Sequence, residues 1–186
     1  MNRQTVKGYQ KTYINDQIWI STFSGGFQRA KVYKPNTEDK WRAGLRVFIK
    51  SKIEESLASS YQIKTPSNKD HIKNLLSIKR KIDKNFKKFL VDGEMKFGVV
   101  QKLFNLYLKL QWCLGNCAEP PHCPFDSIII KKLSMKSPPR WTKFNDRKIY
   151  MDLVERALEV SGNKSIAKWE LETYQKDRLL SNLKKQ

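Results

Sequence analysis

The sequence predicts a mainly α-helical protein: a compact helical domain with a hairpin-like turn before a central helix. Apolar residues recur with the 3.6-residue period of amphipathic helices along most of the chain, and alternating, strand-like runs are scarce. The 186 residues show no internal repeat and are enough to bury one substantial core. We divide the chain into an N-terminal segment, 1–36, and one helical domain, 37–186, in which 37–115 and 126–186 form two lobes.

The N-terminal segment has a mixed pattern. Ile14, Ile18 and Trp19 share one face of a helix, but Gly25 and Gly26 then interrupt the periodicity. We therefore expect the helical pattern to break at the glycine pair, and the sequence leaves open whether this pair belongs to a loop that moves.

Two helices with clear start signals follow. The first begins after Asn36 or Thr37, either of which can cap it, and its periodicity extends for about five turns. Its apolar stripe consists of Trp41, Leu45, Phe48, Ile49, Ile53 and Leu57. The second begins at a capping box made by Ser67 and Asp70, and its stripe is Ile72, Leu75, Leu76 and Ile82.

The strongest helical pattern comes after a turn at Asp92 and Gly93. Its main face consists of Val100, Leu103, Phe104, Tyr107, Leu108 and Gln111, with further apolar residues on other sides. A helix that is apolar on more than one side is central rather than peripheral. We expect it to end near Gly115.

The last third begins with a proline-rich loop over residues 117–124. Asp126 then opens the run SIIIKKL, which suits either a short helix capped by Asp126 or a buried strand. A further periodic stretch predicts a helix that ends near Gly162, and Ser165 caps the last helix.

Charge narrows the class of partner. The 37 Lys and Arg exceed the 18 Asp and Glu by 19, and the excess is clustered. Residues 3–52 and 64–109 each carry a net charge of +8, residues 131–148 carry +6, and residues 152–177 carry −2. So large a charge opposes compaction and indicates an anionic partner. Nucleic acid is the first candidate, because neutralising phosphates releases counterions, and an anionic membrane surface is the second.

The sequence also argues against a membrane-spanning, a secreted or a disulfide-linked protein. No apolar run is long enough to span a membrane, and the first residues lack the apolar core of a secretion signal. The three cysteines lie close together in the sequence and are odd in number, which argues against a disulfide framework. We therefore expect a cytoplasmic protein.

A phosphate site is predicted where the central helix begins. Glycines before a helix leave its first amides bare, and these amides with the helix dipole bind phosphate. Gly98 lies at this point, with Lys96 and Lys102 beside it. The other predicted nucleic-acid-binding residues are cations on the helix after residue 37 and around a tryptophan, namely Arg42, Arg46, Lys50, Arg140 and Lys143.

Asp126 is one of two acidic residues between positions 95 and 145. A lone carboxylate at the start of a helix can simply cap it. Alternatively, it acts as a general base or stabilises a developing cation.

The turn into the central helix at Gly98 and the later PFDS segment resemble the helix-hairpin-helix DNA glycosylase superfamily, over residues 85–135. The resemblance implies that the amides at Gly98 grip a DNA phosphate. It also implies that Asp126 assists cleavage of the N-glycosidic bond of an extruded base. The lysine of that family, two positions after the glycine, is Val100 here, and Lys102 is the nearest residue that could take its role. No cofactor is implied.

An extruded base needs a pocket with aromatic walls. The candidates are Trp112, Phe125 and Trp141, but packing in the core is the favoured explanation of the same residues.

One further cluster resembles a zinc site, made of Cys113, Cys117, His122 and Cys123. Its spacing departs from the paired ligands of structural zinc, so we expect packed thiols and a loop histidine and no metal, with zinc as the alternative.

Two functional hypotheses follow. In the first, the chain binds nucleic acid, DNA in preference to RNA. One form of this hypothesis is an enzyme that acts on DNA with Asp126 as the key acid. In the second, it is a non-enzymatic accessory protein whose basic face binds an acidic protein or a membrane surface. The acidic segment 152–177 would then dock a protein partner.

Overall fold

The computed structural model describes residues 3–183, which form a mainly helical protein with 68% of the chain in helices. The seven α-helices of this part are α1 (Arg3–Phe27), α2 (Asp39–Ser60), α3 (Asn68–Phe86), α4 (Phe97–Cys113), α5 (Ser127–Lys132), α6 (Arg147–Ser161) and α7 (Ile166–Leu183). A short 3₁₀ turn, η1 (Val91–Gly93), precedes α4. The predicted fold class is confirmed.

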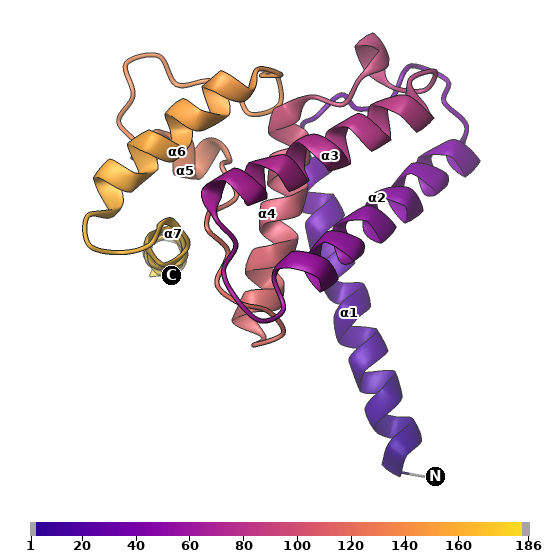
Figure 1. Ribbon diagram of the computed structural model, residues 1–186, viewed down its shortest axis with the longest axis horizontal. Helices are drawn as coiled ribbons and strands as arrows, with labels where there is room; N and C mark the ends of the chain where they lie inside the picture. Colours follow the sequence, from indigo (N-terminus) through magenta and orange to yellow (C-terminus); the bar gives the residue numbers. More distant parts are fainter. Residues whose placement is uncertain (1–2, 184–186) are drawn as a thin grey trace.

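Helix α4 is the central element, as its pattern predicted. In Figure 1 it lies between the α2–α3 pair on one side and the α5–α7 group on the other. Thirteen of its seventeen residues are buried. The other helices therefore bury their apolar stripes largely against α4 or against helices that contact it.

Helix starts are set by local side chains. The Ser67 side chain accepts a hydrogen bond from the Asp70 amide at the start of α3, as the capping box predicted. Asp126 caps α5, which decides the open alternative between a short helix and a strand in favour of the helix. The expected cap of α2 is wrong. Glu38 occupies that position without a side-chain cap, and the Thr37 hydroxyl donates instead to the Lys34 carbonyl.

The expected break at Gly25 and Gly26 is also wrong, since α1 continues through both glycines to Phe27. The physical reason is the close approach of α1 to α4. A Cβ on Gly25 would overlap the side chain of Leu106, and one on Gly26 would overlap Leu103. The glycines therefore serve helix packing rather than a turn.

The N-terminal segment is joined to the rest at a second place. Tyr33 and Leu90 form an isolated antiparallel bridge, with hydrogen bonds from Lys34 to Phe89 and from Val91 to Val32. The segment thus packs on the predicted helical domain through both α1 and the chain that follows it.

The first turns of α1 project from this body, as Figure 1 shows at the lower right. Within the described residues, Ile18 is the first of this helix to be buried. The preceding part of α1 exposes most of its side chains to solvent.

Candidate nucleic-acid interface

The start of α4, where bare amides were expected, is covered by the segment before α6. The amide of Phe97 donates to Asn145 Oδ1 at 3.1 Å, and the amide of Gly98 donates to the Phe144 carbonyl at 3.1 Å. The next two amides, of Val99 and Val100, donate to the Lys96 carbonyl. All four amides have protein partners, so the expectation that they are free for a phosphate is wrong.

Gly98 is nonetheless a required glycine, for a different reason. A Cβ at this position would overlap the Trp141 carbonyl oxygen, which belongs to the covering segment. The glycine lets the backbone of residues 141–144 lie directly on α4. Its role in this structure is packing between two segments that are distant in the sequence.

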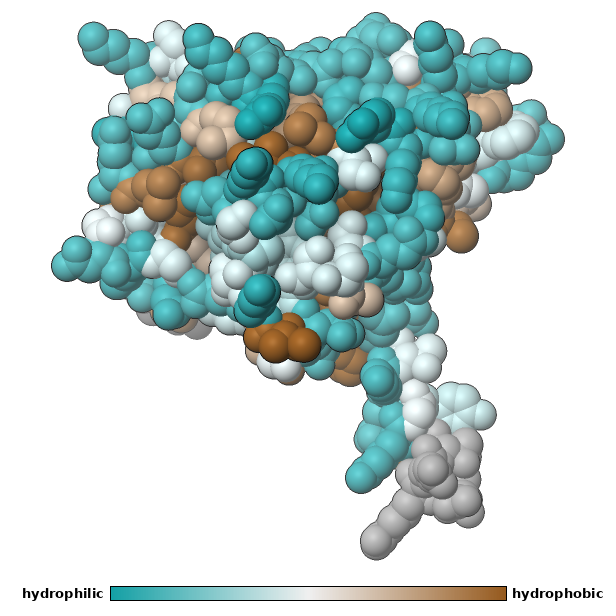
Figure 2. All heavy atoms as spheres, in the orientation of Figure 1, coloured by the Kyte–Doolittle hydropathy of each residue, from teal (hydrophilic) through white to brown (hydrophobic). Residues whose placement is uncertain are grey.

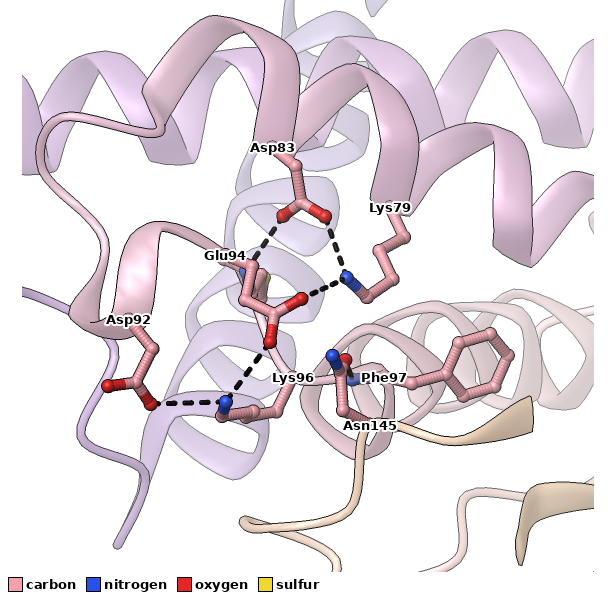
Figure 3. A network of polar contacts seen from close by, with 8 residues as sticks. Lys79, Asp83, Asp92, Glu94, Lys96, Phe97 and Asn145 are labelled. Carbon is pink, nitrogen blue, oxygen red and sulfur yellow. Dashed lines mark hydrogen bonds and ion pairs between the residues drawn. The ribbon is translucent and has the colours of Figure 1, made fainter. Parts of the chain in front are cut away.

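Lys96 lies in a network of carboxylates, which Figure 3 shows from close by. Its ammonium group is 3.1 Å from Asp92 and 3.2 Å from Glu94, and Glu94 also contacts Lys79 at 3.2 Å. Although partial burial opposes the charge, these two carboxylates hold the pKa of Lys96 above its ordinary value. Its charge is thus compensated within the protein.

The structure brings the two predicted catalytic residues together. Lys102 Nζ lies 3.1 Å from Asp126 Oδ2, and the same ammonium group lies 4.5 Å from the centre of the Trp141 ring. The other carboxylate oxygen of Asp126 accepts hydrogen bonds from the amides of Ile128 and Ile129. Asp126 therefore caps a helix and neutralises a largely buried lysine at the same time.

A second pair of this kind lies two turns further along α4, and sequence reasoning missed it. Lys109 Nζ is 2.8 Å from the Glu170 carboxylate and 4.5 Å from the centre of the Tyr174 ring. Burial raises the pKa of Glu170 above its ordinary value, although Lys109 opposes the shift. The seven-residue spacing of Lys102 and Lys109 was the available signal, because it places both on one face of the helix.

Beside the first pair lies a basic groove of about 360 Å³. It is lined by Arg29, Ser127, Ile130, Lys131, Pro138, Pro139, Arg140, Trp141 and Thr142. Its three cations come from three parts of the chain: the segment after α1, helix α5 and the loop before α6. Of the described residues that line the groove, none is acidic.

Arg140 was predicted from the sequence to bind nucleic acid and Trp141 to line a base pocket, and both line this groove. Lys143 follows two residues later and is exposed. Arg29 is the member that sequence reasoning missed. It lies far from Arg140 in the chain, and no local pattern marks it.

The predicted cations of α2 lie elsewhere, over aromatic rings of the N-terminal segment. Arg42 lies 5.4 Å from the ring centre of Tyr33, and Arg46 lies 5.8 Å from that of Phe23. Lys50 lies 5.8 Å from the ring centre of Trp19. These cations form a row along one side of α2, and none of them lines the basic groove.

The structure does not assemble the predicted base pocket. Phe125 is fully buried and packs edge-on against Tyr150, so its ring has no surface to offer a base. Trp112 is half-buried near the end of α4. Of the three predicted aromatics, Trp141 alone lines the groove, with 6% of its surface exposed.

Two histidines, His71 and His122, are buried next to α4 in a polar network. Tyr61 Oη lies 2.8 Å from His71 Nδ1, and Tyr150 Oη lies 2.7 Å from His122 Nδ1. Asn105 donates to the Tyr150 hydroxyl and to a backbone carbonyl. Burial lowers the pKa of His122 to about 3 and that of His71 well below its ordinary value, so both are neutral near pH 7.

The cysteines do not assemble into a ligand set with these histidines. Within residues 3–183, no three His, Cys, Asp or Glu side chains are grouped closely enough to hold a metal ion. Cys113 is exposed at the end of α4, whereas Cys117 and Cys123 are buried free thiols. Burial raises the pKa of all three thiols.

The acidic segment 152–177 uses most of its carboxylates internally. Glu159, Glu170, Glu172 and Asp177 pair with Arg156, Lys109, Lys164 and Lys132, respectively. The last of these pairs joins α5 to α7, and the Lys109 pair joins α4 to α7. The docking of a protein partner by this segment stays a prediction.

The described helices include none with both the length and the apolar character needed to cross a membrane. No family model, curated protein or solved structure matches the chain. The function is therefore inferred from the residues and the geometry of this chain.

Proposed function

We propose that this protein binds nucleic acid, with DNA as the expected partner, through the basic groove. The observation that carries the proposal is the convergence of Arg29, Lys131 and Arg140 on one groove without an opposing carboxylate. Three cations from three separate elements meet there, although nothing in the local folding of any one element requires it. Phosphate groups are the anions that such a cluster binds most readily.

The distribution of acids supports the same proposal. Asp126, which directly precedes the groove residue Ser127, is neutralised by Lys102 and by two amides. Several of the other acids are likewise paired with nearby lysines, and the chain carries a net charge of +19. Hydrophilic residues dominate the face shown in Figure 2.

The direct test is fluorescence anisotropy with labelled duplex DNA, single-stranded DNA and RNA of equal length, over a series of salt concentrations. We expect affinity for duplex DNA to fall linearly with the logarithm of the salt concentration. The Arg29→Gln/Arg140→Gln variant should bind about tenfold or more weakly, with a salt slope reduced by about two. RNA is included because phosphate contacts alone do not distinguish the two polymers.

The matched control is Arg80→Gln/Lys81→Gln on the exposed side of α3, which removes the same charge away from the groove. The control should keep most of the affinity. Equal losses of DNA affinity in both variants would mean that the overall charge of the protein attracts DNA and that the groove is not a specific site. Weak and equal binding of all three polymers would instead favour a protein partner, which a shift in mass on size exclusion would reveal.

A second candidate function, catalysis on DNA, rests on one observation. The 3.1 Å contact between Lys102 and Asp126 lies against Trp141, which lines the groove. We propose Asp126 as the acid that would assist cleavage at an extruded base. The Asp126→Asn variant keeps a side chain that can cap α5 and removes the charge. Loss of product from damaged duplexes with unchanged DNA binding would support this role, and retained turnover would contradict it.

A further inference from the structure

The projecting part of α1 carries large apolar side chains that nothing in the described chain covers. Val6 is 39% exposed, Tyr9 67% and Tyr13 64%. These residues belong to the first turns of α1, and this end of the helix extends away from the body in Figure 1. Exposed apolar residues of this size, grouped on one projecting helix, are typical of an interface with another protein.

Further along the same helix lies an apolar groove of about 690 Å³. It is lined by Asp16, Trp19, Ile20, Phe23, Ser24, Phe27, Gln28 and Arg46. All of these except Arg46 belong to α1 or follow it directly. One helix therefore presents an uncovered apolar ridge at one end and, at the other, an unfilled groove whose apolar lining is Trp19, Ile20, Phe23 and Phe27.

Ridge and groove belong to one continuous stripe. Val6, Tyr9, Tyr13, Asp16, Ile20, Phe23 and Phe27 follow one another at alternating intervals of three and four residues. This is the spacing of the two core positions in a heptad repeat, and it continues for three heptads. Asp16 is the one polar member of the stripe.

The positions that flank this stripe identify the occupant. In a paired helix they face the partner's flanks, and like charges there prevent two identical helices from pairing. Between Val6 and Phe27 all six flanking residues are uncharged. Gln10, Thr12, Gln17 and Ser24 are exposed, whereas Trp19 and Gly26 are buried against α4, so that only the other flank is open to a partner at those turns. In a chain with a net charge of +19 this lack of flanking charge is the feature that permits pairing with a second copy. An acidic partner helix would instead call for basic flanks.

We propose that two copies of this chain associate through antiparallel α1 helices, with the ridge of each copy in the groove of the other. An antiparallel arrangement is required because ridge and groove lie at opposite ends of the same helix. Such an interface is two-fold symmetric and closes on itself, as most homodimer interfaces do.

The stripe also sets the register. When Tyr9 of one copy faces Ile20 of the other, Val6 faces Phe23 and Tyr13 faces Asp16. The Tyr13 hydroxyl can then donate a hydrogen bond to the Asp16 carboxylate, so the polar member of the stripe gains a partner. A parallel pair in register would place the two Asp16 carboxylates against each other, which like-charge repulsion opposes.

The proposal does not depend on nucleic-acid binding, and its first test is the mass of the protein in solution without nucleic acid. We expect light scattering after size exclusion to give twice the chain mass of 21.9 kDa. The Tyr9→Glu/Tyr13→Glu variant should give a monomer with the helical circular dichroism of the native protein. The control, Lys7→Gln/Lys11→Gln on the other side of the same turns, should remain dimeric.

The second test addresses the register, in a Cys113→Ser background that removes the exposed native thiol. Oxidation of the Tyr9→Cys/Ile20→Cys variant should cross-link the dimer covalently, whereas Tyr9→Cys alone should not. A monomer at all concentrations, or a dimer that survives Tyr9→Glu/Tyr13→Glu, would overturn the proposal. Efficient cross-linking by Tyr9→Cys alone would overturn the antiparallel arrangement. If the native protein is a monomer and the Tyr9→Glu/Tyr13→Glu variant binds DNA more weakly, the stripe would be assigned to nucleic acid instead.

Discussion

Helix α4 has two faces that are built in different ways. Toward α1 the contact is apolar and close, with Gly25 and Gly26 against leucine side chains and Trp19 stacked on Tyr107 at 4.3 Å. Toward α5–α7 the contact combines packed aromatic rings with buried polar groups, namely the two lysine pairs and the side-chain amides of Gln101 and Asn105. An apolar contact can absorb a change of shape by moving side chains, whereas a buried polar contact fails when one partner is removed.

On the side of α4 that faces α5–α7, the Gln101 side chain makes three hydrogen bonds. Its amide nitrogen donates to the carbonyls of Gly98 and Phe125, and its amide oxygen accepts from the Phe125 amide. This side chain fixes the chain that leads into Asp126 and the basic groove. The position of the candidate site thus depends on these hydrogen bonds as well as on the packing of Phe125 against Tyr150.

The largest effect should come from breaking the buried pair between Lys109 and Glu170. The Glu170→Ala variant leaves a buried ammonium group without its carboxylate, and we expect a loss of about 3–5 kcal/mol in the free energy of unfolding. The Lys109→Met/Glu170→Leu variant removes both charges and should regain most of that loss. Urea denaturation measures all three proteins. A double variant as unstable as the single one would show that the pair stabilises beyond its own charges.

The buried histidines should make stability depend on pH. The pKa of His122 is about 3 in the folded protein and about 6.5 when unfolded, so protonation favours the unfolded chain. This contribution is complete above pH 6.5 and decreases as the pH falls toward 3. Between pH 7 and pH 4 we expect a loss of about 3 kcal/mol from His122 alone, and more with His71. Urea titrations at both pH values test this prediction.

A His122→Gln variant separates this effect from general acid unfolding. It is expected to be less stable than the native protein at pH 7, because the hydrogen bond to Tyr150 is disturbed. Its further loss between pH 7 and pH 4 should be smaller by about 3 kcal/mol. An unchanged pH dependence would show that protonation of His122 does not cause the loss of stability at low pH.

Alanine substitutions at two glycines test the contrast between the two faces of α4 directly. A Cβ on Gly98 meets the backbone carbonyl of Trp141, which cannot move without undocking the covering segment, so Gly98→Ala should cost about 3 kcal/mol. A Cβ on Gly26 meets the side chain of Leu103, which can rotate, and alanine is the better helix former. Gly26→Ala should therefore cost about 1 kcal/mol. Equal costs in thermal or urea unfolding would contradict the contrast between the faces.

What the sequence could predict follows the same division. The stripes of α2, α3 and α4 were readable because periodicity is local, and Ser67 and Asp126 were readable as caps for the same reason. The course of α1 through Gly25 and Gly26 was not, because it depends on leucines about 80 residues away. The break expected there was a correct interpretation of local propensity that a tertiary contact overrides.

The candidate site shows a similar limit. Lys102 and Asp126 were singled out individually, yet only the fold places them 3.1 Å apart. The phosphate site at Gly98 was inferred from a glycine before a helix, but that pattern does not reveal that residues 141–145 cover the amides. Arg29 could not have been found, since its partners in the groove begin with Ser127, 98 residues later.

The Asp126→Asn variant should have a small effect on stability, and this makes it informative. The asparagine oxygen can still accept hydrogen bonds from the amides of Ile128 and Ile129, so α5 keeps its cap. Lys102 loses a charged partner but keeps its contact with the Trp141 ring and 10% side-chain exposure to water. We expect a loss of about 1–2 kcal/mol in urea unfolding, less than for Glu170→Ala because the pair is less buried. A fold this little disturbed means that lost turnover on DNA would report on the carboxylate itself. A loss as large as that of Glu170→Ala would instead show that Asp126 is needed for the architecture.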